Sequence, residues 1–229
     1  MTHELTALRT SPRSSGALIC IGAVLSVLLM MRHPSIQTHT VAEAIEQMQA
    51  KAALNSFVHG GLLIVLAAIF VGYLGFADRL GWQKLGVRAG AVFYACGVGC
   101  MIGAALINGF IVTALASDYT GQPDAVLEAL KPIFVLCHSA NLALAQAGTI
   151  AISIGILAWS IELLGRGKAA RIIGVLGCLC GALPIAGLLS SHLRLNVHGM
   201  GLVIMAQAVW NLCVGVWLMR QPANEVSAS

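Results

Sequence analysis

Charged residues are scarce in this chain, and most of them stand between long uncharged stretches. Only 10% of the 229 residues are charged and 58% are hydrophobic, with a mean hydropathy of +0.87. Soluble globular domains carry about 25% charged residues, so this composition excludes that class and predicts an integral membrane protein surrounded by a lipid bilayer. Six uncharged stretches are long enough, or nearly so, for spanning helices of about 20 residues. They are residues 14–31, 55–77, 89–117, 132–160, 172–191 and 195–219.

Carboxylates are the scarcest groups of all in the predicted membrane interior. The only one there is Glu162, which lies at the end of the fourth stretch. This absence counts against a carboxylate-bridged di-iron site, a hydrolase with a buried general base and a proton-coupled transporter with a midplane carboxylate. No Cys-x-x-Cys-His sequence is present, which excludes covalent attachment of a c-type haem. There is also no basic patch with interleaved aromatic residues, so no nucleic-acid partner is expected.

The cationic residues predict the orientation of the chain. No small-x-small cleavage site follows the first stretch, which favours an uncleaved span over a signal peptide. With the N-terminus inside, nine of the 13 lysines and arginines fall in cytoplasmic segments, as the positive-inside rule requires. We therefore expect a bacterial-type inner membrane protein with both termini in the cytoplasm. The four cationic residues left on the outer side are Arg32, Lys51, Lys131 and Arg194.

The predicted fold is all-α, a single transmembrane domain over residues 1–229 with six helices arranged as three hairpins. A histidine, a small residue and a leucine four positions after the histidine recur in the second, fourth and sixth spans, which indicates a weak internal repeat. From His59, His138 and His198 to the charged residue ending each span there are 20, 24 and 22 residues. At about 1.5 Å per residue these lengths are close to one hydrocarbon thickness, so all three histidines are predicted to lie at the outer boundary.

Two outer segments are predicted to be helical extensions of the spans, at residues 41–54 and 123–131. Thr40 and Glu43 have the spacing of a capping box, and apolar residues recur on one face after them. Pro123 and Asp124 suit the start of the second extension. The extensions could cover the outer face as a lid, although packing on each other for stability is the favoured interpretation.

The outer histidines predict a transition-metal site. Imidazole is the commonest protein ligand for zinc, copper and haem iron, and ionisable residues in membrane helices tend to be functional. His59, His138 and His198 are the first candidates, with His33, His192 and Asp118 as further ligands or as groups that orient the imidazoles. The alternative for any single one is an interfacial histidine bound to water or a carbonyl. Six histidines fall on the outer side, namely His33, His39, His59, His138, His192 and His198.

A b-type haem is the alternative cofactor. It would need His59 and His198 to face each other, with Arg194 pairing with a propionate. Glycines beside both histidines would let the porphyrin approach, although tight helix packing is the favoured explanation for them. Several amides also lie within the spans. Asn141 could orient a ligand, and interhelical hydrogen bonding is the ordinary role of the others, Asn108, Gln146, Gln207 and Asn211.

The sequence thus supports three functional hypotheses without naming a reaction or a catalytic residue. The first is a transition-metal protein using copper, zinc or iron at the periplasmic face, as a small oxidoreductase or a metal-handling protein. The second is a b-type haem protein that exchanges electrons with a quinol. The third is a cofactor-free transporter or assembly subunit acting on a small molecule.

Overall fold

The computed structural model describes residues 11–35 and 40–221, and in this part the chain forms helices and no strand. Six of the helical segments are long and apolar enough to cross a membrane, which confirms the predicted all-α, six-span class. The third span, Leu85–Tyr119, contains a π-helix, and it begins earlier and ends later than the uncharged stretch that predicted it. The elements are α1 (Pro12–Met31), α2 (Val41–Ala50), α3 (Ala52–Leu80), α4 (Leu85–Leu106), the π-helix η1 (Ile107–Ile111), α5 (Val112–Tyr119), α6 (Asp124–Leu164), α7 (Lys168–Leu189) and α8 (Val197–Met219).

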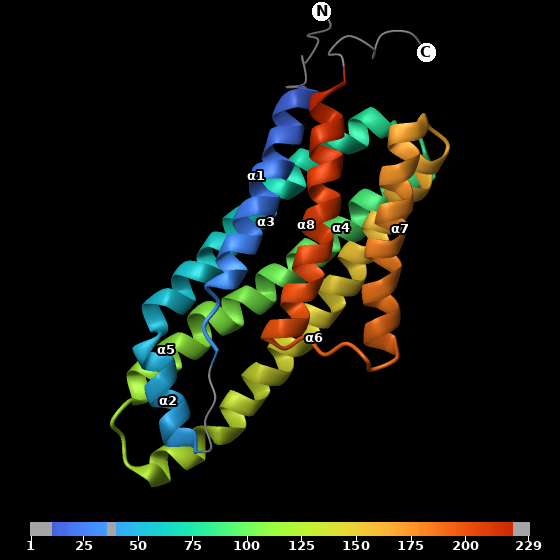
Figure 1. Cartoon of the computed structure of the whole chain (residues 1–229). Coiled ribbons are helices and arrows are strands. Elements are labelled where there is room, and N and C mark those ends of the chain that lie inside the picture. The colour runs from blue at the N-terminus through green and yellow to red at the C-terminus, as the bar shows by residue number, and fades with distance from the viewer. Residues whose placement is uncertain (1–10, 36–39, 222–229) are drawn as a thin grey trace, which may run out of the picture.

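The spanning helices form a closed ring, seen from the side in Figure 1. Each helix packs along its neighbours in the sequence, α1 on α3, α3 on α4, α4 on α6, α6 on α7 and α7 on α8, and α8 then packs on α1. Small residues make the closing contact. A Cβ built on Gly215 would lie only 2.7 Å from the carbonyl oxygen of Gly16, so the two backbones touch. The ring brings the start of α1 and the end of α8 to one end of the bundle.

The two ends of the ring differ in chemistry. We call one the basic end and the other the histidine end. The basic end carries Arg79, Lys84, Arg88, Arg166, Lys168, Arg171 and Arg220. The histidine end carries His33, His59, His138, His192 and His198.

An aromatic cluster fills the ring in its half nearer the basic end. The ring of Tyr73 stacks on Trp159 with 4.8 Å between centroids and on Trp210 with 5.7 Å, and its hydroxyl donates to the side-chain oxygen of Asn211. The indole of Trp159 donates to the Val87 carbonyl at 3.1 Å, so this large buried side chain leaves no polar atom unsatisfied. The cluster packs α3, α6 and α8 against one another and closes the centre of the ring.

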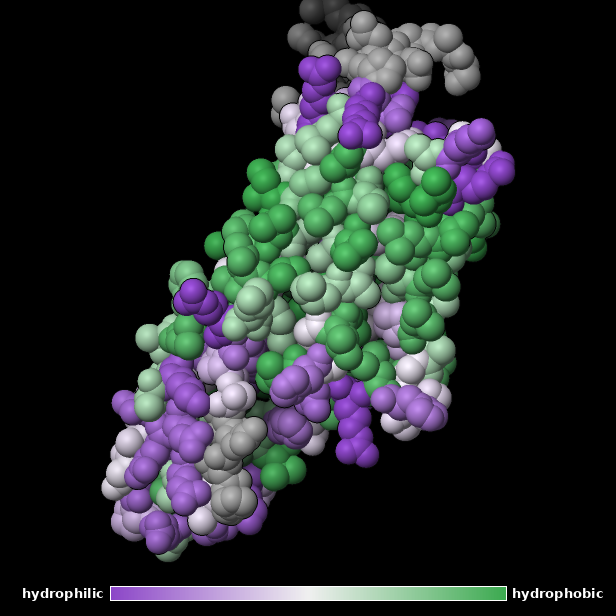
Figure 2. All heavy atoms as spheres, in the orientation of Figure 1, coloured by the Kyte–Doolittle hydropathy of each residue, from purple (hydrophilic) through white to green (hydrophobic). Residues whose placement is uncertain are grey.

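A lobe of α2, α5 and the first turns of α6 projects from the histidine end. Ile45, Ala116 and Leu127 form a small core of its own. The lobe is the lower left part of Figure 2, where hydrophilic residues gather, while hydrophobic residues cover most of the visible remainder. Thr40 caps α2 by accepting from the Glu43 amide at 3.2 Å, and the predicted extension breaks at Lys51 into α2 and α3. The segment packs on α5 and α6.

Close packing of α4 on α6 generates a prediction. A Cβ on Gly97 would lie 2.7 Å from the amide nitrogen of Ile152 and 2.8 Å from the carbonyl oxygen of Gly148, whereas a Cβ on Gly99 would meet nothing within 4 Å. We expect Gly97→Val to lower the free energy of unfolding by about 2 kcal/mol through overpacking. The measurement is thermal or denaturant unfolding in detergent. Gly99→Val is the matched control, and an equal loss in both variants would contradict the packing.

Candidate functional site

A large cavity enters the ring at the histidine end, with a volume of about 1010 Å³. It extends from α2 at the mouth to Tyr94, Ile152 and Asn211 at the depth of the aromatic cluster, and every element except α7 contributes to its walls. Volumes of about 300 to 1,000 Å³ are typical of ligand sites, so this cavity is large enough for a small organic molecule. It is the candidate functional site.

His59 has both of its ring nitrogens hydrogen-bonded to other groups of the protein. Its Nδ1 lies 2.9 Å from the carbonyl oxygen of Asn55, which can only accept, so Nδ1 carries the proton. Its Nε2 therefore accepts, and the side-chain nitrogen of Asn108 donates to it at 3.1 Å. Only 6% of the residue is exposed. The ring is neutral and both of its nitrogens are satisfied by protein groups, as a buried imidazole requires.

The π-helix η1 makes this arrangement possible. The carbonyl of Asn108 accepts from the side-chain nitrogen of Asn55 at 2.7 Å, and that of Gly109 accepts from the Ser56 hydroxyl at 2.8 Å. Asn55 also donates to Thr113 at 3.1 Å. Gly109 allows the close approach, because a Cβ there would lie 2.7 Å from Cγ of His59. A widened turn at a functional site is a common use of π-helices, and here it binds α3 to the third span through polar groups.

His33 follows the end of α1 and meets His59. The two rings are 5.0 Å apart between centroids at an interplanar angle of 66°. The Nδ1 of His33 donates to the Pro34 carbonyl at 2.9 Å, which leaves the lone pair on Nε2. Burial lowers the pKa of His33 below its ordinary value, and the hydrogen bond to Pro34 opposes that shift in part. The imidazole is therefore held in its neutral, ligand-competent form at neutral pH.

The predicted site residues divide into two groups. His33, His59, His138 and His198 all line the cavity, so the structure brings four of the six predicted metal residues to one space. The other two, His192 and Asp118, are exposed and do not line it. The Nδ1 of His192 instead lies 3.0 Å from the carbonyl and the hydroxyl oxygens of its neighbour Ser190.

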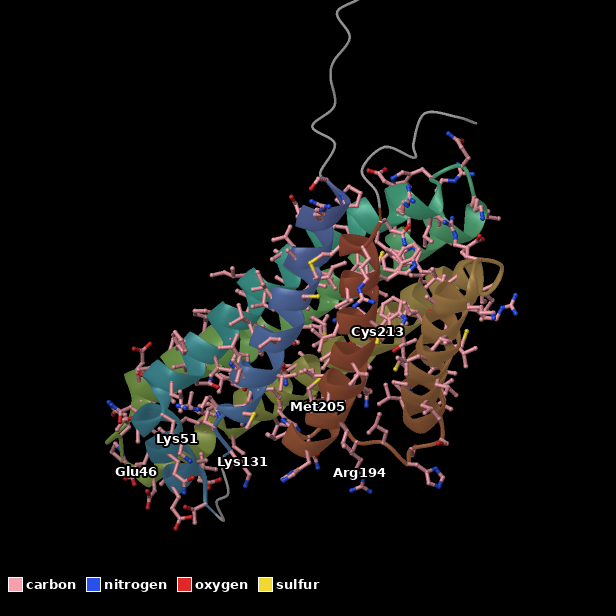
Figure 3. All side chains as sticks on the ribbon, turned by 45° about the horizontal axis from the view of Figure 1, so that its top comes forward. Glu46, Lys51, Lys131, Arg194, Met205 and Cys213 are labelled. Atoms are coloured by element: carbon pink, nitrogen blue, oxygen red, sulfur yellow. The ribbon has the colours of Figure 1, made fainter. Side chains whose placement is uncertain are left out.

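The three residues predicted to bind a haem are also not all in one place. His59 and His198 line the cavity, whereas Arg194 does not. Figure 3 shows Arg194 projecting from the segment before α8, apart from Lys51 and Lys131 at the other side of the histidine end. Of the glycines beside the histidines, Gly201 has nothing within 4 Å of a built Cβ, and Gly61 would meet Leu29 of α1 at 3.0 Å. Gly61 thus serves helix packing.

Metal coordination by three side chains is not formed in this conformation. Within residues 11–35 and 40–221, no group of three or more histidine, cysteine, aspartate or glutamate side chains is placed to hold a metal ion. His39 lies outside the described residues. The ligand assignment therefore stays a prediction, and it would need His138 or His198 to move toward His33 and His59.

Sequence reasoning missed the groups that position His59. Asn108 was identified only as an amide inside a span, and Asn55 and Thr113 were given no role. The one signal was the Asn108-Gly109 pair, a polar residue and a glycine that interrupt an apolar span near its outer end.

No known protein family, curated protein or solved structure matches this chain. The chemistry of the cavity itself is therefore the basis for a functional assignment. That chemistry consists of imidazoles and amides among apolar residues, with three charged residues, Lys51, Glu128 and Lys131, also on the walls.

The polar contacts of Asn55 generate a second prediction. Asn55→Ala removes the donor to Asn108 and Thr113, and at about 1 kcal/mol per lost bond it should destabilise the fold by about 2 kcal/mol. Asn141→Ala is the matched control, because Asn141 lines the same cavity and its side chain has no hydrogen-bond partner among the described residues. Unfolding in detergent measures both variants. A loss at Asn141 as large as that at Asn55 would show that the network does not hold α3 to η1.

Proposed function

We propose that this protein is a multi-pass inner membrane protein that binds an uncharged, amphipathic small molecule of the quinol class in its large cavity. The observation that carries the proposal is a cavity of about 1010 Å³ inside the ring, with uncharged polar groups at its deep end. Polar side chains are costly inside a membrane and mark functional sites there. A small oxidoreductase and a transporter would both need such a binding site.

The walls suit a molecule with a polar head and an apolar remainder. Leu62, Leu66 and Val203 supply apolar surface. On the same walls, the side-chain nitrogen of Gln207 is buried and has no hydrogen-bond partner in the described part of the chain. An oxygen of a bound quinol or quinone would accept from that nitrogen and so remove the cost of an unsatisfied buried donor. The charged residues of the lining lie at the start of α3 and in the first turns of α6; they are Lys51, Glu128 and Lys131.

The orientation is part of the proposal. The basic end gathers most of the cationic residues and would face the cytoplasm under the positive-inside rule, with both termini on that side. The histidine end and the projecting lobe would then face the periplasm. A ligand would enter the cavity from that side.

Binding of a short-chain quinone is the direct test. We expect the protein in lipid nanodiscs to bind it at equilibrium, and Gln207→Leu to weaken binding about tenfold because it removes a buried donor. Tryptophan fluorescence reports binding, since Trp159 and Trp210 stack on Tyr73 at the inner end of the cavity. Gln146→Leu is the matched control, because Gln146 is exposed and does not line the cavity. Absence of binding, or an equal loss in both variants, would contradict the proposal.

A transition metal is the second candidate. The observation that favours it is that four imidazoles share one cavity and that the rings of His33 and His59 are already in contact. Copper, zinc and iron accept imidazole ligands. A b-type haem would use His59 and His198 from two different helices, α3 and α8, and would give the protein a role in electron transfer.

Metal analysis and the visible spectrum of the purified protein test this candidate. Stoichiometric copper, zinc or iron without a Soret band is expected for the metal site, and a Soret band for haem. In either case, His198→Ala should abolish binding and His192→Ala, which lies outside the cavity, should not. Neither metal nor haem in the wild-type protein would contradict both cofactor hypotheses.

A further inference from the structure

The inner walls of the large cavity carry three polar side chains whose hydrogen-bonding capacity the protein itself does not fully use. They come from three helices, and each is more than nine-tenths buried. Tyr94 of α4 is 3% exposed, Thr149 of α6 is 2% exposed and Asn211 of α8 is 6% exposed. Burial of a polar group costs free energy unless a partner satisfies it. A group of such side chains on the wall of one cavity therefore indicates a ligand.

Each of these side chains retains a hydrogen-bond donor without a partner. The hydroxyls of Tyr94 and Thr149 make no hydrogen bond within the part of the chain that the structure describes. The side-chain oxygen of Asn211 accepts from the hydroxyl of Tyr73, so only the N–H groups of this amide remain available. The buried nitrogen of Gln207, one turn from Asn211 on α8, is a fourth donor of this kind. The inner end of the cavity thus has an excess of uncharged donors.

The donors lie far below the histidines that line the same cavity. Thr149 follows His138 by 11 residues on α6, which at about 1.5 Å per residue places it about 17 Å deeper. Tyr94 and Asn211 both adjoin the aromatic cluster. The ring of Tyr94 is 4.8 Å from that of Tyr73 between centroids, and the hydroxyl of Tyr73 donates to Asn211. A polar ring that reached these donors would lie at the inner end of the cavity, with an apolar tail directed toward the histidine end.

We propose that this inner end is the head-group subsite of the cavity and that it takes a carbonyl oxygen, so that the oxidised form of the ligand, a quinone, binds with its ring inward. The inference rests on the proposed function and specifies the redox form and the orientation of the ligand. A carbonyl oxygen has two lone pairs and brings no hydrogen, whereas a quinol hydroxyl adds one more donor to walls that already have donors in excess. A carbonyl therefore satisfies more of the buried groups than a hydroxyl does.

Calorimetric titration under anaerobic conditions compares the two redox forms. The probes are a short-chain benzoquinone and its quinol, each titrated into the full-length protein in lipid nanodiscs. We expect the quinone to bind about tenfold more tightly than the quinol, because only the carbonyl avoids the addition of a donor. Binding of the quinol as tight as that of the quinone, or tighter, would overturn the assignment of a carbonyl oxygen to this subsite.

Two conservative variants test the residues themselves. Tyr94→Phe and Thr149→Val each remove one hydroxyl and keep nearly the same volume, and each should weaken binding of the quinone about fivefold. The thermal stability of the ligand-free protein should not fall, because neither hydroxyl has a partner among the described residues. A purely structural role would lower that stability. Tyr119→Phe is the matched control, because Tyr119 ends α5 in the lobe, does not line the cavity and should leave binding unchanged.

The outcomes separate this inference from the proposed function on which it rests. If neither redox form binds, both fail. If the quinone binds and Gln207→Leu weakens it while Tyr94→Phe and Thr149→Val do not, the quinone site stands and only the head-group subsite is overturned. A larger loss in Asn141→Leu than in either hydroxyl variant would place the polar ring nearer the histidines and would also overturn the inference.

Discussion

The contact between α1 and α8 is the constraint on which the rest of this structure depends. Gly16 and Gly215 bring the two backbones together, and the ring of spanning helices closes there. An open row of the same helices would expose its polar inner face to lipid, where unsatisfied polar groups cost several kcal/mol each. Closure lets the chain keep histidines and amides at membrane depth, because they face an enclosed space. The cavity is thus a consequence of two small residues far apart in the sequence.

Inside the ring, the histidines have different roles. His59 is fully used by the protein, since its two nitrogens join Asn55 and Asn108 and so connect α3 to η1. His138 and His198 are exposed to the cavity. This division is compatible with a site in which His59 stabilises the wall of the cavity and His138 and His198 are available to contact a ligand. A metal bound by His59 would have to displace Asn108 from its Nε2, whereas the proposed quinol-type ligand would leave that hydrogen bond in place.

The sequence predicted the six spans and the placement of the histidines at one end of the bundle well, because both depend on distance along a helix. Depth follows from counting residues, so His59, His138 and His198 could be assigned to one end. Direction around the helix axis is a different quantity, and it decides that Asp118 of α5 does not line the cavity, whereas His192 lies in the loop after α7. The hydrogen bond from Asn55 to Asn108 joins residues that are 53 positions apart, and it depends on the π-helix. The hydrophobic periodicity of an apolar span does not predict a π-helix. Orientation in the membrane and the hairpin repeat stay predictions.

The stacked rings of Tyr73, Trp159 and Trp210 affect how a solute could move through the protein. They lie between the large cavity and the basic end, and the hydroxyl of Tyr73 is engaged by Asn211. In this conformation the stack lies across the inner end of the large cavity. Movement of a solute from the cavity past this stack would require α8 to separate from α3 and α6, which would break the stack at its centre.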